Sequence, residues 1–182
     1  MATAEQYESI IASLQWDGLR ALWDNIEKRN TPGWEQGKAF EYLVIRAFQL
    51  DGAEVKYPYR VQLFEEEVEQ IDGAVYCSGL SCLVESKDFK TNVDVTPIAK
   101  LRNQLLRRPA GTVGLVFSRT GFTEAARHLS HFSLPQAILL WHGEEIKYVL
   151  ENEIICELLT LKYRVCVENA FPDYDIRERD IP

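Results

Sequence analysis

The sequence predicts an α/β fold, of the α+β kind, in which helices flank one mixed central β-sheet. Its length of 182 residues fits a single domain with a sizeable hydrophobic core. Late in the chain, strand patterns alternate with helical patterns, which requires crossover connections and some parallel pairing. Earlier, three strand patterns follow one another closely enough for an antiparallel meander. We therefore expect one domain over residues 1–182, with an extra N-terminal helix in 1–32, an αβββαβ core in 33–142, and a helical extension with a tail in 143–182.

Two helices are predicted before the first strand. Residues 3–29 carry apolar side chains at approximately helical spacing, and the stretch "NTPGW" ends this helix with a proline and a glycine. A second helix is expected from Trp34 to Leu50, where "DG" at positions 51 and 52 stops it.

The meander is predicted from three segments. "AEVKYPYRV" has the pattern of an edge strand, because Pro58 cannot donate to a strand ladder. After the acidic stretch "EEEVEQ", the segments "QIDGAVYC" and "LSCLVESK" form the next two strands. Ser78 and Gly79 between them suit the two-residue turn of a hairpin.

The later elements alternate. "VTPIAKLRNQLLRR" is predicted to be a helix with Thr96 as its N-cap and Pro97 at its first position. "TVGLVFS" and "QAILLW" are expected as buried strands, with a short helix, "TEAARHLSHF", between them. Residues 143–168 are expected to be helical, and the polar tail "FPDYDIRERDIP" to be loose.

Charge is distributed unevenly along the chain. The net charge is −8, which argues against a protein covered in positive charge. Residues 87–127 nevertheless hold eight basic and three acidic residues, so that segment is +5 and the remainder is −13. Such asymmetry can concentrate positive potential at one surface, although ordinary solvated helix faces would give the same count.

The sequence lacks membrane-spanning, signal-peptide and zinc-binding patterns. No apolar run approaches the roughly 20 residues that span a bilayer, and "MATAEQYESI" lacks the features of a signal peptide. We therefore expect a cytoplasmic protein without membrane contact. The four cysteines form no C-x2-C pair, so buried reduced thiols are expected rather than a zinc site.

Three charged residues lie inside the predicted hairpin, where strands usually carry apolar side chains. If Ser78 and Gly79 form the turn, cross-strand partners have numbers that sum to 157, and Asp72 then lies opposite Glu85. Lys87 follows two residues after Glu85 and projects from the same face of the strand.

This arrangement predicts a metal site. Opposed carboxylates destabilise a hairpin unless something offsets their repulsion, and a divalent cation does so. Mg²⁺ prefers hard oxygen ligands and keeps several waters or phosphates, so Asp72 and Glu85 are the predicted ligands, with Mn²⁺ able to substitute. Lys87 would position, or help to deprotonate, the attacking water. Metal-assisted phosphodiester hydrolysis is the predicted chemistry, and a solvated surface hairpin is the alternative.

These residues resemble the PD-(D/E)xK nuclease superfamily, and within it the Mrr-like (type IV) restriction endonucleases. The motif is Asp72 in "QID" followed by Glu85 and Lys87 in "VESK". "GKAFEYLVIRAFQLDGAEV" resembles the helix and strand before the motif, and "GTVGLVFSRTGFTEAA" the strand and helix after it. The resemblance covers about residues 33–130. Ile71 replaces the motif proline, which is common variation.

The resemblance implies a restriction-endonuclease-like core and Mg²⁺-dependent DNA cleavage in defence against foreign DNA. Glu41 in "GKAFEYL" takes the place of a further carboxylate near the metal, and Gln104 would reach the substrate or the water. Gln70 shares strand parity with Asp72 and would line the same face.

DNA and protein partners are also implied. Lys90, Lys100, Arg107 and Arg108 are the expected phosphate contacts, three of them on the helix that starts near Pro97. Cleavage of both strands favours a homodimer. About 30 residues precede the matched region, too few for the winged-helix domain of many Mrr-like enzymes, so a partner protein would supply target recognition. A repair or junction-resolving nuclease, and a catalytically silent DNA- or protein-binding module, are the alternative functions.

Overall fold

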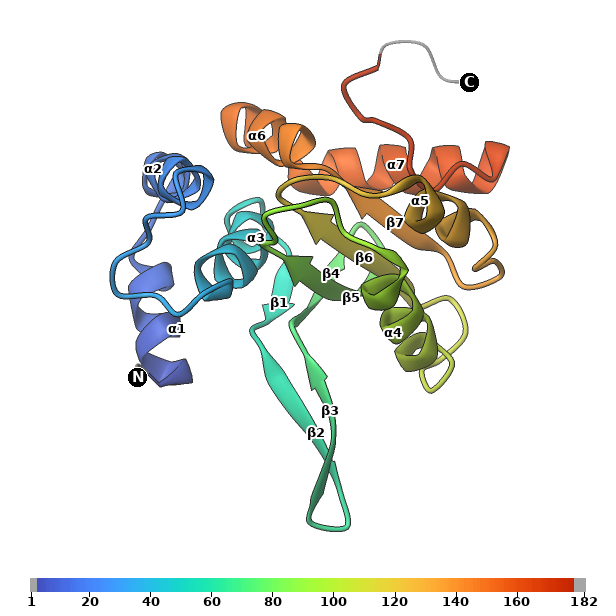
Figure 1. Cartoon of the computed structure of the whole chain (residues 1–182), viewed down its shortest axis with the longest axis horizontal. Helices are drawn as coiled ribbons and strands as arrows, with labels where there is room; N and C mark the ends of the chain where they lie inside the picture. The colour runs from blue at the N-terminus through green and yellow to red at the C-terminus, as the bar shows by residue number, and fades with distance from the viewer. Residues whose placement is uncertain (1–2, 179–182) are drawn as a thin grey trace.

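A five-stranded mixed sheet runs through the centre of the computed structural model, which describes residues 3–178 (Figure 1). In spatial order its strands are β1 (Glu54–Lys56), β4 (Gly73–Cys77), β5 (Leu80–Lys87), β6 (Val113–Ser118) and β7 (Ile138–Trp141). The first three pair antiparallel, and β5, β6 and β7 pair parallel. The predicted mixed sheet is confirmed, and β1 lies at its edge as Pro58 indicated.

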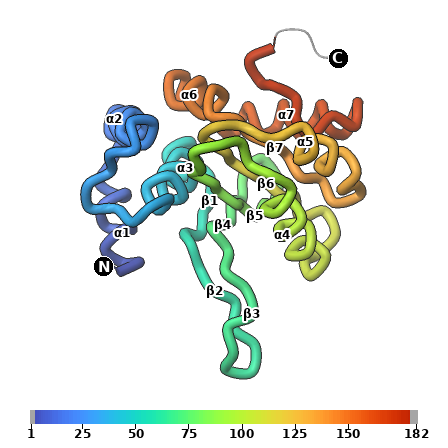
Figure 2. The backbone as a smooth tube through the Cα atoms, viewed as in Figure 1, coloured from blue at the N-terminus to red at the C-terminus, as the bar shows by residue number. Residues whose placement is uncertain are grey.

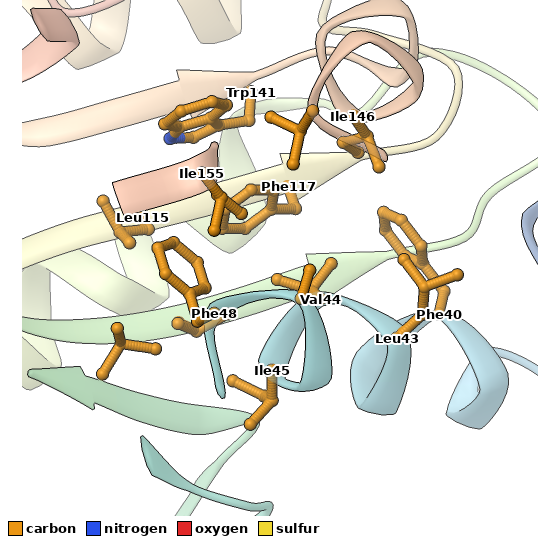
Figure 3. Packing of buried hydrophobic residues seen from close by; sticks show 14 of the residues in the cluster. Phe40, Leu43, Val44, Ile45, Phe48, Leu115, Phe117, Trp141, Ile146 and Ile155 are labelled. Carbon is orange, nitrogen blue, oxygen red and sulfur yellow. The ribbon is translucent and has the colours of Figure 1, made fainter. Parts of the chain in front are cut away.

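Helices cover both faces of this sheet. One face carries α3 (Lys38–Leu50), α6 (Gly143–Asn152) and α7 (Ile155–Asn169), and the other carries α4 (Val95–Leu105) and α5 (Glu124–His131). Alternate strand residues point to opposite faces, so Phe117 packs beneath the first group and Val116 beneath the second. Figure 3 shows Phe48 of α3 against Phe117, with ring centroids 6.2 Å apart. Burial on both faces explains the uninterrupted apolar sequences of β6 and β7.

The N-terminal region forms two helices, α1 (Ala4–Ala12) and α2 (Trp16–Glu27), so the prediction of one continuous helix is wrong. The break is stabilised by Arg46 of α3, whose guanidinium donates to the carbonyls of Ala12 at 2.9 Å and Leu14 at 3.1 Å. These bonds satisfy carbonyl groups that the end of α1 leaves without intrahelical partners. The turn allows both helices to pack their apolar stripes on α3.

A two-stranded hairpin, β2 (Tyr59–Leu63) and β3 (Glu66–Ile71), projects from the body (Figures 1 and 2). We call residues 59–71 the arm. Its existence corrects two predictions. "AEVKYPYRV" divides into β1 and β2 at residues 57–58, because the Pro58 nitrogen cannot donate to a ladder, and the acidic stretch is mostly strand rather than a connection. "QIDGAVYC" likewise divides at Asp72, where the arm joins the sheet.

Several helix boundaries also differ from prediction. Asp94 is the N-cap of α4, accepting from the Thr96 amide at 2.9 Å, so Pro97 is the third helical residue. The helix ends at Leu105, before the two arginines. The second predicted helix starts at Lys38 rather than Trp34, since Gly37 has a positive φ. Residues 143–168 form two helices that separate where Glu153 takes a left-handed conformation.

The C-terminal segment packs against the body, so the prediction of a loose tail is wrong for residues 171–178. Tyr174 and Ile176 are buried, and the Lys162 ammonium donates to the Tyr174 carbonyl at 2.6 Å. Residues 179–182 lie outside the described part of the chain. None of the helices in the described residues is long and apolar enough to cross a membrane. All four cysteines are free, two of them buried and two half-buried.

Candidate active site

Asp72 is the single residue that connects the arm to β4. Its carboxylate is buried, and its Oδ2 accepts a hydrogen bond from the backbone N–H of Ser86 at 2.9 Å. The next residue must be small, because a Cβ on Gly73 would overlap the side chain of Ile45 in α3. The glycine therefore lets α3 approach the strand directly behind this carboxylate.

The β4–β5 hairpin fixes the position of Glu85. Its turn is Ser78 and Gly79, both with positive φ, and its register pairs Gly73 with Val84, so the predicted register is confirmed. Continued by one pair, this register brings Asp72 opposite Glu85. The Glu85 side chain is 1% exposed, which is rare for a carboxylate and requires compensating partners.

Two lysines compensate the buried carboxylates. Lys87 Nζ lies 2.6 Å from Glu85 Oε1 and 3.4 Å from Asp72 Oδ2, so one ammonium bridges both acids. Lys100, on α4, places its Nζ 2.7 Å from Glu85 Oε2. Burial would lower the pKa of Lys87, but Asp72 and Glu85 outweigh that effect, and the pKa is raised. Lys87 is therefore an ammonium ion in this arrangement.

Glu41 lies at the border of the same cluster. Its side chain is 13% exposed and pairs with Lys38 Nζ at 2.6 Å. Burial raises the pKa of Glu41, the charge of Asp72 raises it further, and Lys38 and Lys87 offset part of the increase. Glu41, the third carboxylate of the cluster, is thus close enough to Asp72 and Lys87 to interact with both.

The donor set fits a hard divalent cation. The bridging Lys87 ammonium marks a position where one positive charge is already shared by the two carboxylates. Within residues 3–178, no group of three or more His, Cys, Asp and Glu side chains is gathered as a metal site. Asp72 and Glu85 would thus leave most coordination positions to water and phosphate oxygens, as Mg²⁺ favours.

One family model matches most of the chain. The model of the Mrr-type restriction endonuclease family matches residues 35–150, which contain all six charged residues described above. The chain belongs to the restriction endonuclease family. The resemblance inferred from the motif is therefore confirmed. A search of curated proteins gave no match.

A solved restriction endonuclease subunit shares the fold. The small subunit of the heterodimeric restriction endonuclease R.BspD6I aligns with a TM-score of 0.57 at 12% identity, over 88% of this chain and 92% of that chain. MspJI, solved with a 27-mer oligonucleotide, aligns at 0.41 and 16% identity over 95% of this chain and 36% of its own. A protein of unknown function, AF1548, aligns at 0.46 and 20% identity over 56% of each chain. The chain thus spans about half of AF1548 and about a third of MspJI.

Two further predicted residues of this restriction endonuclease domain, Gln104 and Gln70, lie at the base of the arm. Gln104 is buried, and its Nε2 donates to the backbone carbonyl of Gln70 at 3.1 Å, two residues before Asp72. It therefore supports the strand that carries a site residue. The Gln70 side chain is exposed.

The predicted DNA contacts are not gathered on one helix face. Arg107 and Arg108 lie beyond the end of α4, and both bind the buried carboxylate of Glu69 at the base of the arm. Lys100 points to Glu85 instead. Lys90 is exposed and borders a cleft of about 500 Å³ that also includes Arg29.

Sequence reasoning missed Lys38 and Glu69, and it assigned Lys100 to DNA phosphate rather than to Glu85. Lys38 was detectable, because its i, i+3 spacing to Glu41 allows an ion pair on one helix. Lys100 contacts Glu85 across 15 residues of sequence, and Glu69 pairs with arginines 38 and 39 residues away. No local sequence pattern indicates either contact.

Proposed function

We propose that this chain is a Mg²⁺-dependent DNA endonuclease that hydrolyses phosphodiester bonds in defence against foreign DNA. The observation that carries the proposal is the pair of buried carboxylates, Asp72 and Glu85, bridged by the Lys87 ammonium. A surface hairpin has no need for this cluster, since burying charges costs free energy that only function or excellent pairing offsets. Membership of the restriction endonuclease family supports the same reaction class.

Each residue has a separate role in this proposal. Asp72 and Glu85 would hold Mg²⁺, which when bound stabilises the charge that develops on the phosphoryl oxygens. The amide of Ser86 fixes the Asp72 carboxylate, and Lys100 fixes that of Glu85. Lys87 positions the attacking water and stabilises the phosphate by donating hydrogen bonds, because it is an ammonium ion here. Glu41 would accept a hydrogen bond from the same water.

Phosphate binding would come from the basic residues around this cluster. Lys90 and Arg29 border one cleft beside it, and Arg107 and Arg108 lie at the base of the arm on the other side. Contacts of this kind position a duplex without reading its sequence. We therefore propose that a partner protein supplies target recognition; the R.BspD6I small subunit, of similar extent, is one part of a heterodimer.

Nicking of supercoiled plasmid tests the proposal. The protein should convert plasmid to open-circular or linear form with Mg²⁺ or Mn²⁺ and not with EDTA. Lys87→Ala should lower the rate by about 10²–10⁴-fold, the usual contribution of a positioned proton-transfer group, with DNA affinity largely retained. Lys87→Arg should not restore the rate, because a planar guanidinium cannot take the same place.

Lys147, an exposed lysine of α6, provides the matched control, and Lys147→Ala should cut at the wild-type rate. Cleavage by Lys87→Ala at nearly the wild-type rate would contradict the assigned role. A wild-type protein that binds DNA but cuts none of several substrates, with any of several metals, would favour the binding-module alternative.

A further inference from the structure

The tip of the arm exposes apolar side chains far from the body of the molecule. Phe64 is 98% exposed, and Leu63 and Val68 are about half exposed. Figure 1 shows the tip as the point of the hairpin most distant from the sheet. Clustered exposed apolar residues mark interaction sites more often than chance, and aromatic residues are the commonest anchors of protein interfaces.

The backbone of the tip is unfavourable for its sequence. Phe64 and Glu65 form the two-residue turn, and their φ angles are 50° and 69°. Turns with two positive φ angles prefer Asn and Gly, whereas a bulky aromatic residue at positive φ is strained. Strain of this kind persists where function requires it. The phenylalanine is therefore poorly explained by the stability of the hairpin alone.

The chemistry of the tip argues against DNA as its partner. Glu65, Glu66 and Glu67 follow Phe64 in the sequence, and all three are exposed, with Glu67 paired to Arg60 of β2. Carboxylates repel the phosphate backbone, which binds proteins through lysine and arginine. The complementary surface would instead be an apolar cavity with arginine at its border.

The chain itself has such a cavity. A pocket of about 320 Å³ lies between the end of α4 and the segment before β7. Most of its lining is apolar, including Leu105, Leu106, Val113, Pro135 and Ala137, and Arg108, Thr112, Gln136 and Tyr163 complete its wall. Leu106 is 59% exposed, and the neighbouring Arg107 side chain is 55% exposed. An apolar cavity of about 150 Å³ is sufficient to bind benzene, so this pocket has room for a phenyl ring.

We propose that two copies of this chain form a symmetric dimer by exchanging arms, with Phe64 of each copy inserted into the Leu106 pocket of the other. The arm cannot fill the pocket of its own copy, because it points away from the body (Figure 2). Arg107 and Arg108 bind Glu69 of the arm, so the pocket lies beside the arm base, and one two-fold operation can exchange both tips. The glutamates of each tip then face the arginines beside the other pocket.

Sedimentation of the full-length chain tests this proposal without reference to nuclease activity. The wild-type protein should dimerise reversibly. Phe64→Asp should weaken dimerisation by about 10³-fold, since each of the two equivalent anchors contributes about 30-fold, the effect of an ordinary hot spot. Phe132→Asp is the matched control, because Phe132 is also a largely exposed phenylalanine but lies outside the arm and the pocket lining. It should dimerise as the wild type does.

Mixing two variants separates arm exchange from other dimers. Leu106→Asp should also abolish self-association, because it places a charge in the pocket. A mixture of Phe64→Asp and Leu106→Asp proteins should form heterodimers, since one arm and one pocket remain intact and the loss is only about 30-fold. A monomeric wild type, a Phe64→Asp protein that dimerises normally, or a mixture that stays monomeric would each overturn the proposal.

Discussion

At the scale of single residues, the Lys87 ammonium and a divalent cation would compete for the same two carboxylates. Lys87 Nζ is 2.6 Å from Glu85 and 3.4 Å from Asp72, so a metal at this position would displace it toward the water and phosphate. The lysine thus neutralises the site when no metal is bound, and would be released for catalysis when one is. This dual use explains why a buried acid pair is tolerated within a stable sheet.

Metal binding should therefore stabilise the fold measurably. At an ion concentration about tenfold above its dissociation constant, Mg²⁺ or Mn²⁺ should add about 1.4 kcal/mol, which raises Tm by about 3–6 °C for a chain of this length. Asp72→Asn should reduce this shift, whereas Asp24→Asn, an exposed aspartate of α2, should leave it unchanged. Melting curves that do not change with millimolar metal would contradict the proposed metal site, whose carboxylates are buried rather than solvated.

At the scale of elements, the arm is held by Gln104 of α4, which donates to the Gln70 carbonyl, and by the two arginines that follow this helix. Glu69 is buried beneath Arg107 and Arg108. Burial would raise the pKa of Glu69, but the two arginines outweigh it, and the pKa is lowered. The same arginines are proposed DNA contacts, so the arm and the phosphate backbone would compete for them.

Removing these arginines should weaken DNA binding equally for all sequences. The Arg107→Ala, Arg108→Ala double variant should also lower the salt dependence of binding, by about one unit of slope per lost phosphate contact. Glu69→Gln should change affinity in the opposite direction, because it frees both guanidinium groups. Titrations at several salt concentrations provide the measurement, and an unaltered slope in the double variant would show that the arginines serve only the arm.

The turn of the arm offers a test of stored strain. Replacing Phe64 by Asn and Glu65 by Gly should increase the protection of arm amides in hydrogen exchange, because these residues adopt positive φ at lower cost. The gain expected is about 1–2 kcal/mol in local stability. Unchanged or reduced protection would show that the turn is not strained.

Sequence patterns correctly predicted the elements that depend on residues close together in the chain. The Ser78–Gly79 turn and the period-2 alternation gave the register that brings Asp72 opposite Glu85. They did not predict the features that depend on contacts between residues far apart in the sequence. The division between α1 and α2 depends on Arg46, more than 30 residues away, and the arm combines an acidic strand with a turn that violates residue preference. Neither feature has a local signal.

At the scale of the whole molecule, a buried ion pair joins the C-terminal segment to α6 and α7. Lys162 Nζ lies 2.5 Å from Glu145 Oε1, and both side chains are fully buried. The same glutamate oxygen accepts from the Ile176 amide at 3.1 Å, and Lys162 donates to the Tyr174 carbonyl. Residues 171–178 are therefore part of the folded unit.

Breaking this pair should destabilise the protein strongly. Lys162→Met leaves Glu145 buried without a counter-charge and should lower the free energy of unfolding by about 3–5 kcal/mol in urea denaturation. The double variant with Glu145→Leu should recover much of the loss, since replacing both partners avoids an isolated charge. Two single variants whose effects simply add would contradict this account.

Because Asp72 is the single residue between the arm and β4, a movement of the arm relative to the sheet would rotate the backbone at a proposed metal ligand. Strands of five to six residues extend about 17–20 Å, so moving the tip sideways by about 3 Å rotates the base by about 10°. Catalytic groups tolerate misalignment of only about 10–20°. Two sets of bonds hold the base of the arm, from Gln104 to the Gln70 backbone and from Glu69 to its two arginines. Their strength therefore determines how far a movement of the tip rotates the Asp72 carboxylate. A partner that binds the tip would therefore also fix the orientation of Asp72.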